Sequence, residues 1–395
     1  MSVHATLGSR DLYPRLQFPI YLAHSAIAPI CEPVEKRMIE TMMAYAHQGM
    51  GCVMQFVEER ELLRASLAQL IHAHPEEIAL TKNTSEGIIA IAQSLTWSTG
   101  DRIILFDGEF PSNITPWLQV AKQHHLNPLI LSKPQTPEQV LNEVENNLQK
   151  GARLLSLSAV QFQTGFRMPL EEIGALCQQY DCLFFVDAIQ ACGVTPIDVR
   201  AQNIDFLSTG GHKWLMGVEG TACLYIRKER IPLLQRHFAS WLSHQDGLSF
   251  LFEGAGLLRY DRPIKQDASF LEGGVANAIG FSGLDAAINI LLGLGVENIF
   301  QHVQLYIDPL EKELQHLGFQ SLRIKGAESS ILSLIPPKGF TVMNLVPKYE
   351  QRGVCITGPD GLLRIAPHWS NHNQEHELLI AITKEILAQE SSTSK

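Results

Sequence analysis

The chain has 395 residues, 45% of them hydrophobic and 18% charged, with a formal net charge of −10 at pH 7. This is an ordinary globular composition, and the length suffices for a large core or for two domains. The acidic balance, without a cluster of Lys and Arg, argues against nucleic acid or an anionic membrane as the main partner. The seven cysteines form no C-x-x-C pair, which favours free thiols and a cytoplasmic location.

Membrane and metal signals are weak. The most apolar long segment, residues 279–296, is interrupted by Asp285 and Asn289, so we expect a packed helix and no membrane span. The N-terminal stretch lacks the apolar core of a signal peptide. His368, His372 and His376 have helical spacing but no complementary Cys or carboxylate, so we predict no metal site.

The first predicted elements lead to a polar helix start. Residues 1–20 are expected to form an irregular arm, and residues 57–72 a helix with an apolar stripe. A short strand ends at residue 81, and Thr84 and Ser85 are N-cap types just before the next helix. The free N–H groups and positive dipole end of such a helix suit a phosphate, although plain capping is the alternative.

Strands and helices then alternate between residues 79 and 226. This order predicts a mostly parallel sheet with helices on both faces, an α/β fold. A long helix over 296–317 is expected to lead into a smaller C-terminal α+β domain, with a last helix over 374–388. The expected strands of the sheet cover residues 102–107, 128–131, 153–158, 183–186, 204–207 and 221–227.

One acid and one lysine stand out in this stretch. Asp187 follows the apolar run 183–186, at the carboxyl end of a buried strand, where open α/β sheets place their ligands. Lys213 follows Gly210 and Gly211 in a turn beside an apolar patch. The lysine could form a Schiff base with an aldehyde cofactor while the acid pairs with a pyridine nitrogen. Taken singly, each residue could be a turn cap or a surface lysine.

The surrounding motifs resemble those of one enzyme family. Val186-Asp187-Ala188-x-Gln190, then Asp205-Phe206 and Gly211-His212-Lys213-Trp214, resemble the pyridoxal-phosphate (PLP) enzymes of the class V aminotransferase family. That family includes cysteine desulfurases and isopenicillin N epimerase-like proteins, and the resemblance runs from about residue 21 to 377. It implies the PLP transferase fold type I: an arm (1–20), a large PLP-binding domain with a seven-stranded type of sheet (21–290) and a small C-terminal domain (291–395).

The resemblance also implies roles for single residues. Lys213 would carry the cofactor as a Schiff base and move the Cα proton of an amino-acid substrate, with His212 assisting beside it. Asp187 would bind the pyridinium nitrogen, and Gln190 would lie near the phenolic oxygen. Further cofactor contacts are expected from Thr84 and Ser85 to the phosphate and from Phe110, stacked on the ring, with a core Phe as the alternative.

Substrate and neighbouring-subunit contacts follow in the same way. Arg364 would grip the substrate carboxylate, since a planar guanidinium suits a carboxylate, although a structural Arg is the alternative. His24 and Gln161 are polar candidates near the substrate. In a homodimer, Gly274 would reach the phosphate of the neighbouring subunit.

The sequence departs from the family in two phosphate-binding places. Val275 stands where the family has Thr, so only backbone contacts from Gly274 are expected there. Gly210 stands where desulfurases have Ser, a loss that Thr209 could offset.

The reaction is left open by these residues. The loop 358–361 contains no Cys where desulfurases carry their nucleophile, and Cys355 lies before it in an expected strand. We therefore disfavour persulfide chemistry and rank a PLP-dependent aminotransferase first, a C–S β-lyase second and an amino-acid epimerase third. A PLP-fold protein without catalysis is the alternative of another class.

Overall fold

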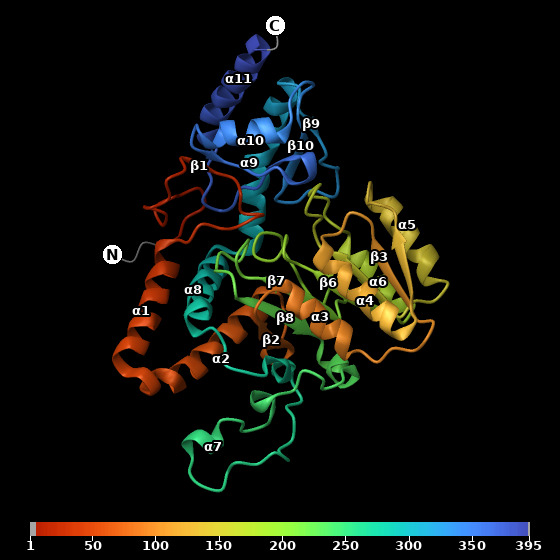
Figure 1. Cartoon of the computed structure of the whole chain (residues 1–395). Helices are drawn as coiled ribbons and strands as arrows, with labels where there is room; N and C mark the ends of the chain where they lie inside the picture. Colours follow the sequence, from red (N-terminus) through yellow and green to blue (C-terminus); the bar gives the residue numbers. More distant parts are fainter. Residues whose placement is uncertain (1–4, 394–395) are drawn as a thin grey trace.

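The computed structural model describes residues 5–393. The first four residues of the predicted arm (1–20) and the last two of the predicted C-terminal domain (291–395) lie outside the described residues. Figure 1 shows a central sheet with helices around it, and the C-terminal elements gathered above the sheet.

The central sheet has seven strands in the order β2-β8-β7-β6-β5-β3-β4. Strand β8 is antiparallel to both of its neighbours, while the pairs among the remaining strands are parallel. Most of these strands are buried from end to end, as expected for apolar runs covered on both faces. The predicted α/β fold with a mostly parallel sheet is confirmed. The strands are β2 (Ile78–Thr81), β3 (Arg102–Phe106), β4 (Asn127–Leu131), β5 (Leu154–Ser158), β6 (Leu183–Asp187), β7 (Phe206–Gly210) and β8 (Ala222–Ile226).

Two clusters of buried side chains lie against the sheet. One joins α3 (Thr84–Ser94) and α4 (Thr115–His124) to Phe185 and Phe206. The other joins α5 (Pro137–Leu148) and α6 (Leu170–Gln179) to Phe184. Because Phe184 and Phe185 are adjacent in one strand, their side chains point to opposite faces, and the helices therefore cover both faces of the sheet.

Helices α1 (Glu32–Gln48), α2 (Val53–Leu70) and α8 (Ala278–Leu294) pack together at one side. Helix α9 (Val296–His316) then leads to a three-stranded antiparallel sheet in the order β12-β10-β9. The predicted domain boundary at 290/291 falls inside α8 and stays a prediction. The C-terminal elements are β9 (Gln320–Ser321), β10 (Leu332–Ile335), α10 (Val342–Glu350), β11 (Val354–Cys355), β12 (Leu363–Ile365) and α11 (Glu375–Thr393).

The N-terminal segment returns to this C-terminal part. Strand β1 (Ile20–Tyr21) pairs in parallel with β11, and the Leu22 amide donates to the Cys355 carbonyl at 2.8 Å. The segment 242–268 contains one short helix, α7 (Ser249–Phe252), and extends away from the body (Figure 1). The 3₁₀ turns are Gly49–Cys52, Pro75–Glu77, Pro111–Asn113, Lys228–Leu233, Trp241–Ser243, Ala268–Glu272 and Pro359–Gly361.

Within residues 5–393, we find no single helix with the length and apolar character needed to cross a bilayer. Helices α8 and α9 reach these criteria only as a pair, and the pair is bent by 77°.

Candidate active site

Two strand ends place the acid and the lysine. Asp187 is the last residue of β6, and its neighbours in register are Ser158 on β5 and Ser208 on β7. Lys213 follows the end of β7 in a tight turn, where the Gly217 amide donates to the Gly211 carbonyl at 2.8 Å. A Cβ at Gly211 would clash with the Thr221 hydroxyl, so the glycine is required for this turn to fold against β8.

Burial shifts the pKa values of Asp187 and Lys213 towards each other. It raises the pKa of Asp187 to about 6, against the opposing effects of the Ile189 amide, which donates at 3.0 Å, and of Lys213. Burial likewise lowers the pKa of Lys213 to about 8, while the charge of Asp187 opposes this and Arg364 adds to it. Part of the lysine is therefore a neutral amine near pH 8, the form that can attack an aldehyde.

Phe110 lies near the amine of Lys213. Its ring centre is 5.9 Å from Lys213 Nζ and 5.3 Å from the Phe162 ring, which meets it edge-on at 88°. The Phe110 side chain is 47% exposed, so the protein core does not account for its position. The core alternative is thus not what the structure shows, and the stacking role stays a prediction.

Several buried polar atoms of the site have no hydrogen-bond partner among the described residues. Thr84 Oγ1, Thr209 Oγ1 and both amide atoms of Gln161 belong to this group. Thr84 is the first residue of α3. It lies beside β7, where Ser208 Oγ donates to the Thr84 carbonyl at 3.0 Å. Buried polar groups are nearly always paired, so these atoms fit a polar ligand such as a phosphate ester. Ser85, in contrast, already pairs with Ser112 at 2.8 Å.

Gln190 is engaged by the protein. Its amide nitrogen donates to the Ser25 carbonyl at 3.0 Å, and its oxygen accepts from Trp214 Nε1 at 2.9 Å. His24 lies in the same cluster of rings, stacked at 6.2 Å on Trp214 and edge-on at 5.3 Å to His368. These contacts fix the residue that follows Lys213.

His24 itself has one ring nitrogen occupied. Its Nδ1 lies 3.0 Å from the Ala366 carbonyl, while Nε2 has no partner among the described residues. Burial, followed by the effect of His368, lowers the pKa of His24 well below its usual value. The substrate contact proposed for His24 from the sequence stays a prediction.

His212 fills the space beside Gly210. A Cβ at Gly210 would lie 3.2 Å from the His212 ring, and a serine side chain there would crowd that ring. Burial and the nearby charge of Lys213 lower the pKa of His212, which favours a neutral imidazole beside the lysine. The Ala28 amide donates to the His212 carbonyl at 2.9 Å, which ties the turn to the N-terminal segment.

Arg364 is a buried cation without a carboxylate partner among the described residues. Its side chain donates from Nε to Thr357 Oγ1 at 3.1 Å and from Nη1 to the Phe162 carbonyl at 2.8 Å. The residue is 6% exposed, and burial lowers its pKa to about 10. A guanidinium held by neutral acceptors alone is costly to bury, so the position suits an anionic ligand.

Gly274 lies apart from this group. It lines a cavity of about 620 Å³ with Lys82, Glu86 and Val275, and none of Asp187, Lys213 and Arg364 lines it. Val275 is 81% exposed.

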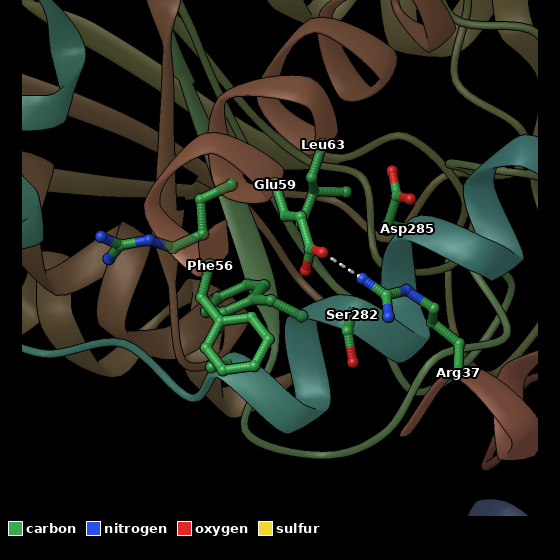
Figure 2. A pocket seen from close by; sticks show the side chains of 9 residues that line it. Arg37, Phe56, Glu59, Leu63, Ser282 and Asp285 are labelled. Atoms are coloured by element: carbon green, nitrogen blue, oxygen red, sulfur yellow. Dashed lines mark ion pairs between the residues drawn. The ribbon is translucent and has the colours of Figure 1, made fainter. Parts of the chain in front are cut away.

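A second, much smaller cavity lies between α1, α2 and α8 (Figure 2). Its volume of about 20 Å³ holds little more than one water. An ion pair of 2.5 Å between Arg37 and Glu59 crosses it, and Asp285 and Phe56 lie beside this pair. Residues 5–393 contain no group of three or more His, Cys, Asp or Glu side chains that could hold a metal ion.

Sequence reasoning missed one buried acid. Glu109 follows β3 and was not among the predicted site residues, but its carboxylate accepts from Asn113 Nδ2 at 3.0 Å and from the Ser158 amide at 2.8 Å. Its place three residues beyond a buried strand was the available signal.

Comparison with known proteins identifies the family. The model of the class-V aminotransferases matches residues 20–363. The chain belongs to the class-V aminotransferase family. The resemblance seen in the motifs is thereby confirmed, and with it a PLP-dependent enzyme of the aminotransferase or lyase type with PLP as cofactor. The unpartnered atoms of Thr84, Thr209 and Gln161 fit that cofactor on structural grounds.

The relatives of this chain are described as an aminotransferase and as a cysteine desulfurase. An uncharacterized aminotransferase, YcbU, of Bacillus subtilis is 25% identical over 93% of this chain and 94% of its own. A probable cysteine desulfurase of Pyrococcus abyssi is 30% identical over 72% and 70%. Among solved structures, the apo cysteine desulfurase of Thermococcus onnurineus NA1 has a TM-score of 0.86 at 22% identity, covering 98% of this chain and all of that one. The latter likeness establishes the fold.

Proposed function

We propose that this class-V family member acts at the Cα of an amino acid and is an aminotransferase. The observation that carries the proposal is Arg364, a buried guanidinium without a carboxylate partner among the described residues, close enough to Lys213 to lower its pKa. A free amino acid offers an α-carboxylate for the guanidinium and an α-amine next to it. The Arg364 guanidinium and the Lys213 amine thus match the two functional groups of a free amino acid.

PLP, when bound, supplies an electron sink for the charge that forms at Cα. Lys213 would hold the cofactor and, as a neutral amine, take and return the Cα proton. Asp187, as an anion, would hold a positive charge on the ring nitrogen. Phe110 would cover the ring face against water.

Further side chains would complete the site. Thr84, Ser85 and Thr209 would donate hydrogen bonds to the phosphate, and Gln190 would lie beside the phenolic oxygen. Gln161 and His24 would lie near the substrate, and His212 would assist next to Lys213.

Sulfur transfer is disfavoured on a local ground. The 3₁₀ turn Pro359–Gly361, where desulfurases carry a nucleophilic thiol, has none. Burial raises the pKa of Cys355 in β11 to about 11, which keeps that thiol protonated and unreactive. A C–S β-lyase needs no such thiol and is the second candidate. A structure described as the cystine C-S lyase C-DES with its reaction product cysteine persulfide shares this fold, with a TM-score of 0.82 at 20% identity.

We also infer a homodimer in the cytoplasm. Helix α1 exposes Ile39, Met42 and Met43, an apolar row that a partner surface would cover. Gly274 lines a cavity that none of Asp187, Lys213 and Arg364 lines, so a contact to the phosphate of a neighbouring subunit is compatible with its position. All seven cysteines are free thiols, as expected in a reducing compartment. Light scattering coupled to size-exclusion chromatography tests this inference, and the mass of a monomer would refute the dimer.

The proposed function is tested by replacing the lysine. Lys213→Ala should abolish the visible absorbance of bound PLP and nearly all turnover, whereas Lys122→Ala on the surface of α4 should change neither. The native enzyme is then titrated with a panel of amino acids, with keto acid, pyruvate, sulfide and chirality followed in parallel. Keto acid formation supports the aminotransferase, pyruvate with sulfide the lyase and loss of optical activity the epimerase. A Lys213→Ala protein that keeps both absorbance and turnover refutes the assignment.

A further inference from the structure

The carboxyl of Glu109 joins the loop after β3 to the end of β5. Its Oε1 accepts from the Ser158 amide at 2.8 Å. Its Oε2 accepts from Asn113 Nδ2 at 3.0 Å and from the Ser158 hydroxyl. Asn113 is held in turn by Trp117 Nε1 at 3.2 Å and by Ser156 Oγ at 2.6 Å. The carboxyl is therefore fully hydrogen-bonded in a buried network of neutral groups.

The charge around this acid is unusual for a buried carboxyl. Another buried glutamate, Glu77, pairs with Arg200, whereas no cation among the described residues pairs with Glu109. Burial raises the pKa of Glu109 to about 7, and the charge of Asp187 adds to this against its hydrogen bonds with Asn113 and Ser158. Burying an ionisable carboxyl without a counter-ion costs free energy of folding, and a neutral side chain at this position would avoid that cost.

Glu109 is connected to the active site in two ways. Ser158 is the register partner of Asp187, and the Ala159 amide donates to the Asp187 carbonyl at 2.8 Å. On the other side, Glu109 is bonded directly to Phe110 along the chain. Phe110 is 47% exposed, and its ring makes an edge contact with Phe162. Its backbone is linked to this network on both sides, because it follows Glu109 in the chain and its carbonyl accepts from the Asn113 backbone amide at 2.8 Å.

We propose that Glu109 is a positioning residue for the cofactor ring, which fixes Phe110 at a set distance from the strand end that carries Asp187. This rests on the proposed function, since a ring must bind between the two. The acid on β6 and the aromatic residue after β3 come from separate strands. The Glu109–Ser158 bonds connect them through β5, the strand between those two.

The alternative is that Glu109 only stabilises the fold. The two cases differ in how substitutions combine. If Glu109 acts through Phe110, its loss has little further effect once the Phe110 ring is gone. If it acts on stability alone, its loss lowers the free energy of unfolding and leaves PLP binding unchanged. If it affects binding independently of Phe110, the binding free energies lost in the two single variants add in the double variant.

The experiment measures the dissociation constant of PLP for the apoprotein and the induced circular dichroism of bound PLP. The variants are Glu109→Ala, Phe110→Ala and the double variant, with Glu77→Gln as the control for a lost buried carboxylate. Ser158→Ala, which removes one Glu109 contact and keeps the acid, is the second probe should Glu109→Ala fail to fold.

We expect each single site variant to weaken PLP binding about tenfold and to reduce the dichroism. The double variant should be no weaker than Phe110→Ala by more than about threefold. Ser158→Ala should shift binding in the same direction, again with little effect in the Phe110→Ala background. Glu77→Gln should lower the melting temperature and leave binding and dichroism unchanged.

Three results would overturn the inference. The first is wild-type PLP binding by Glu109→Ala or, if that variant does not fold, by Ser158→Ala. The second is a double variant that binds PLP about a hundredfold more weakly than the native protein, as the product of the single effects. The third is a loss of PLP binding in Glu77→Gln equal to that in Glu109→Ala. A native protein that shows no visible absorbance with PLP would instead refute the proposed function, so the two failures are distinguishable.

Discussion

Lys213 Nζ and the centre of the Phe110 ring are 5.9 Å apart, across the carboxyl end of the central sheet. The amine comes from the turn after β7 and the ring from the loop after β3. A half-exposed aromatic ring facing a partly buried amine is explained better by a bound flat ligand than by packing in the core.

The stacking role of Phe110 predicts a loss of cofactor affinity without a loss of the Schiff-base lysine. Phe110→Leu keeps an apolar side chain but removes the flat face, so PLP should bind about tenfold more weakly to the apoprotein. Phe250→Leu, on the outlying α7, is the matched control and should bind normally. Equal affinities of the two variants, measured by fluorescence quenching, would contradict the role.

The carboxylate contact of Arg364 predicts a defect in substrate binding. Arg364→Lys keeps the charge but loses the planar fork, so KM for the amino acid should rise about tenfold or more, with the absorbance of bound PLP retained. Arg352→Lys changes a partly buried arginine that pairs with Glu385 and should leave KM unchanged. Steady-state kinetics with one substrate suffices, and an unaltered KM in Arg364→Lys would speak against the contact.

The lowered pKa of Lys213 predicts the pH dependence of PLP uptake. The neutral amine attacks the aldehyde, so the uptake rate of the apoprotein should rise with pH around a midpoint of about 8. The charge of Asp187 raises the pKa of Lys213, so Asp187→Asn should move the midpoint to lower pH. Stopped-flow absorbance measures the rate. A midpoint near the usual lysine value, or an upward shift in Asp187→Asn, would contradict this account.

The raised pKa of Glu109 predicts how stability changes with pH. The folded protein holds this proton more tightly than the unfolded chain, so stability falls as pH rises from about 4.5 to about 7. Relative to Glu109→Gln, which cannot ionise, the wild-type apoprotein should lose about 3 kcal/mol over that window. Urea unfolding at several pH values tests this, and parallel profiles of the two proteins would exclude it.

The unpartnered hydroxyl of Thr209 predicts opposite effects on binding and stability. Thr209→Val removes a buried hydroxyl that has no partner among the described residues, so the apoprotein should be equally or more stable. PLP should nevertheless bind about tenfold more weakly, because a phosphate contact is lost. Thr41→Val is the control, since Thr41 Oγ1 donates to Ser282 at 2.8 Å and its loss should lower stability. Thermal melts and PLP titrations are the two measurements, and unchanged affinity in Thr209→Val would refute the phosphate contact.

Much of the fold could be predicted from local patterns. The apolar run before Asp187 forms β6, and the N-cap residues after β2 start α3, with Asn83 accepting from the Glu86 amide at 2.8 Å. The helices α4 and α10 were not predicted. Each carries proline, Pro116 at the start of one and Pro347 inside the other, and proline is read locally as a break.

By itself, the sequence determined the mostly parallel α/β fold, the family and the two groups at the strand ends, Asp187 and Lys213. These follow from contiguous residues, because apolar runs and turn types act over a few positions. Only the tertiary structure decided which polar groups pair within the protein and which are left for a ligand. Glu109 meets Ser158 across 49 positions and Arg364 meets Phe162 across 202. Hydrogen bonds between residues so far apart depend on how the strands are arranged, and burial sets their electrostatic effect.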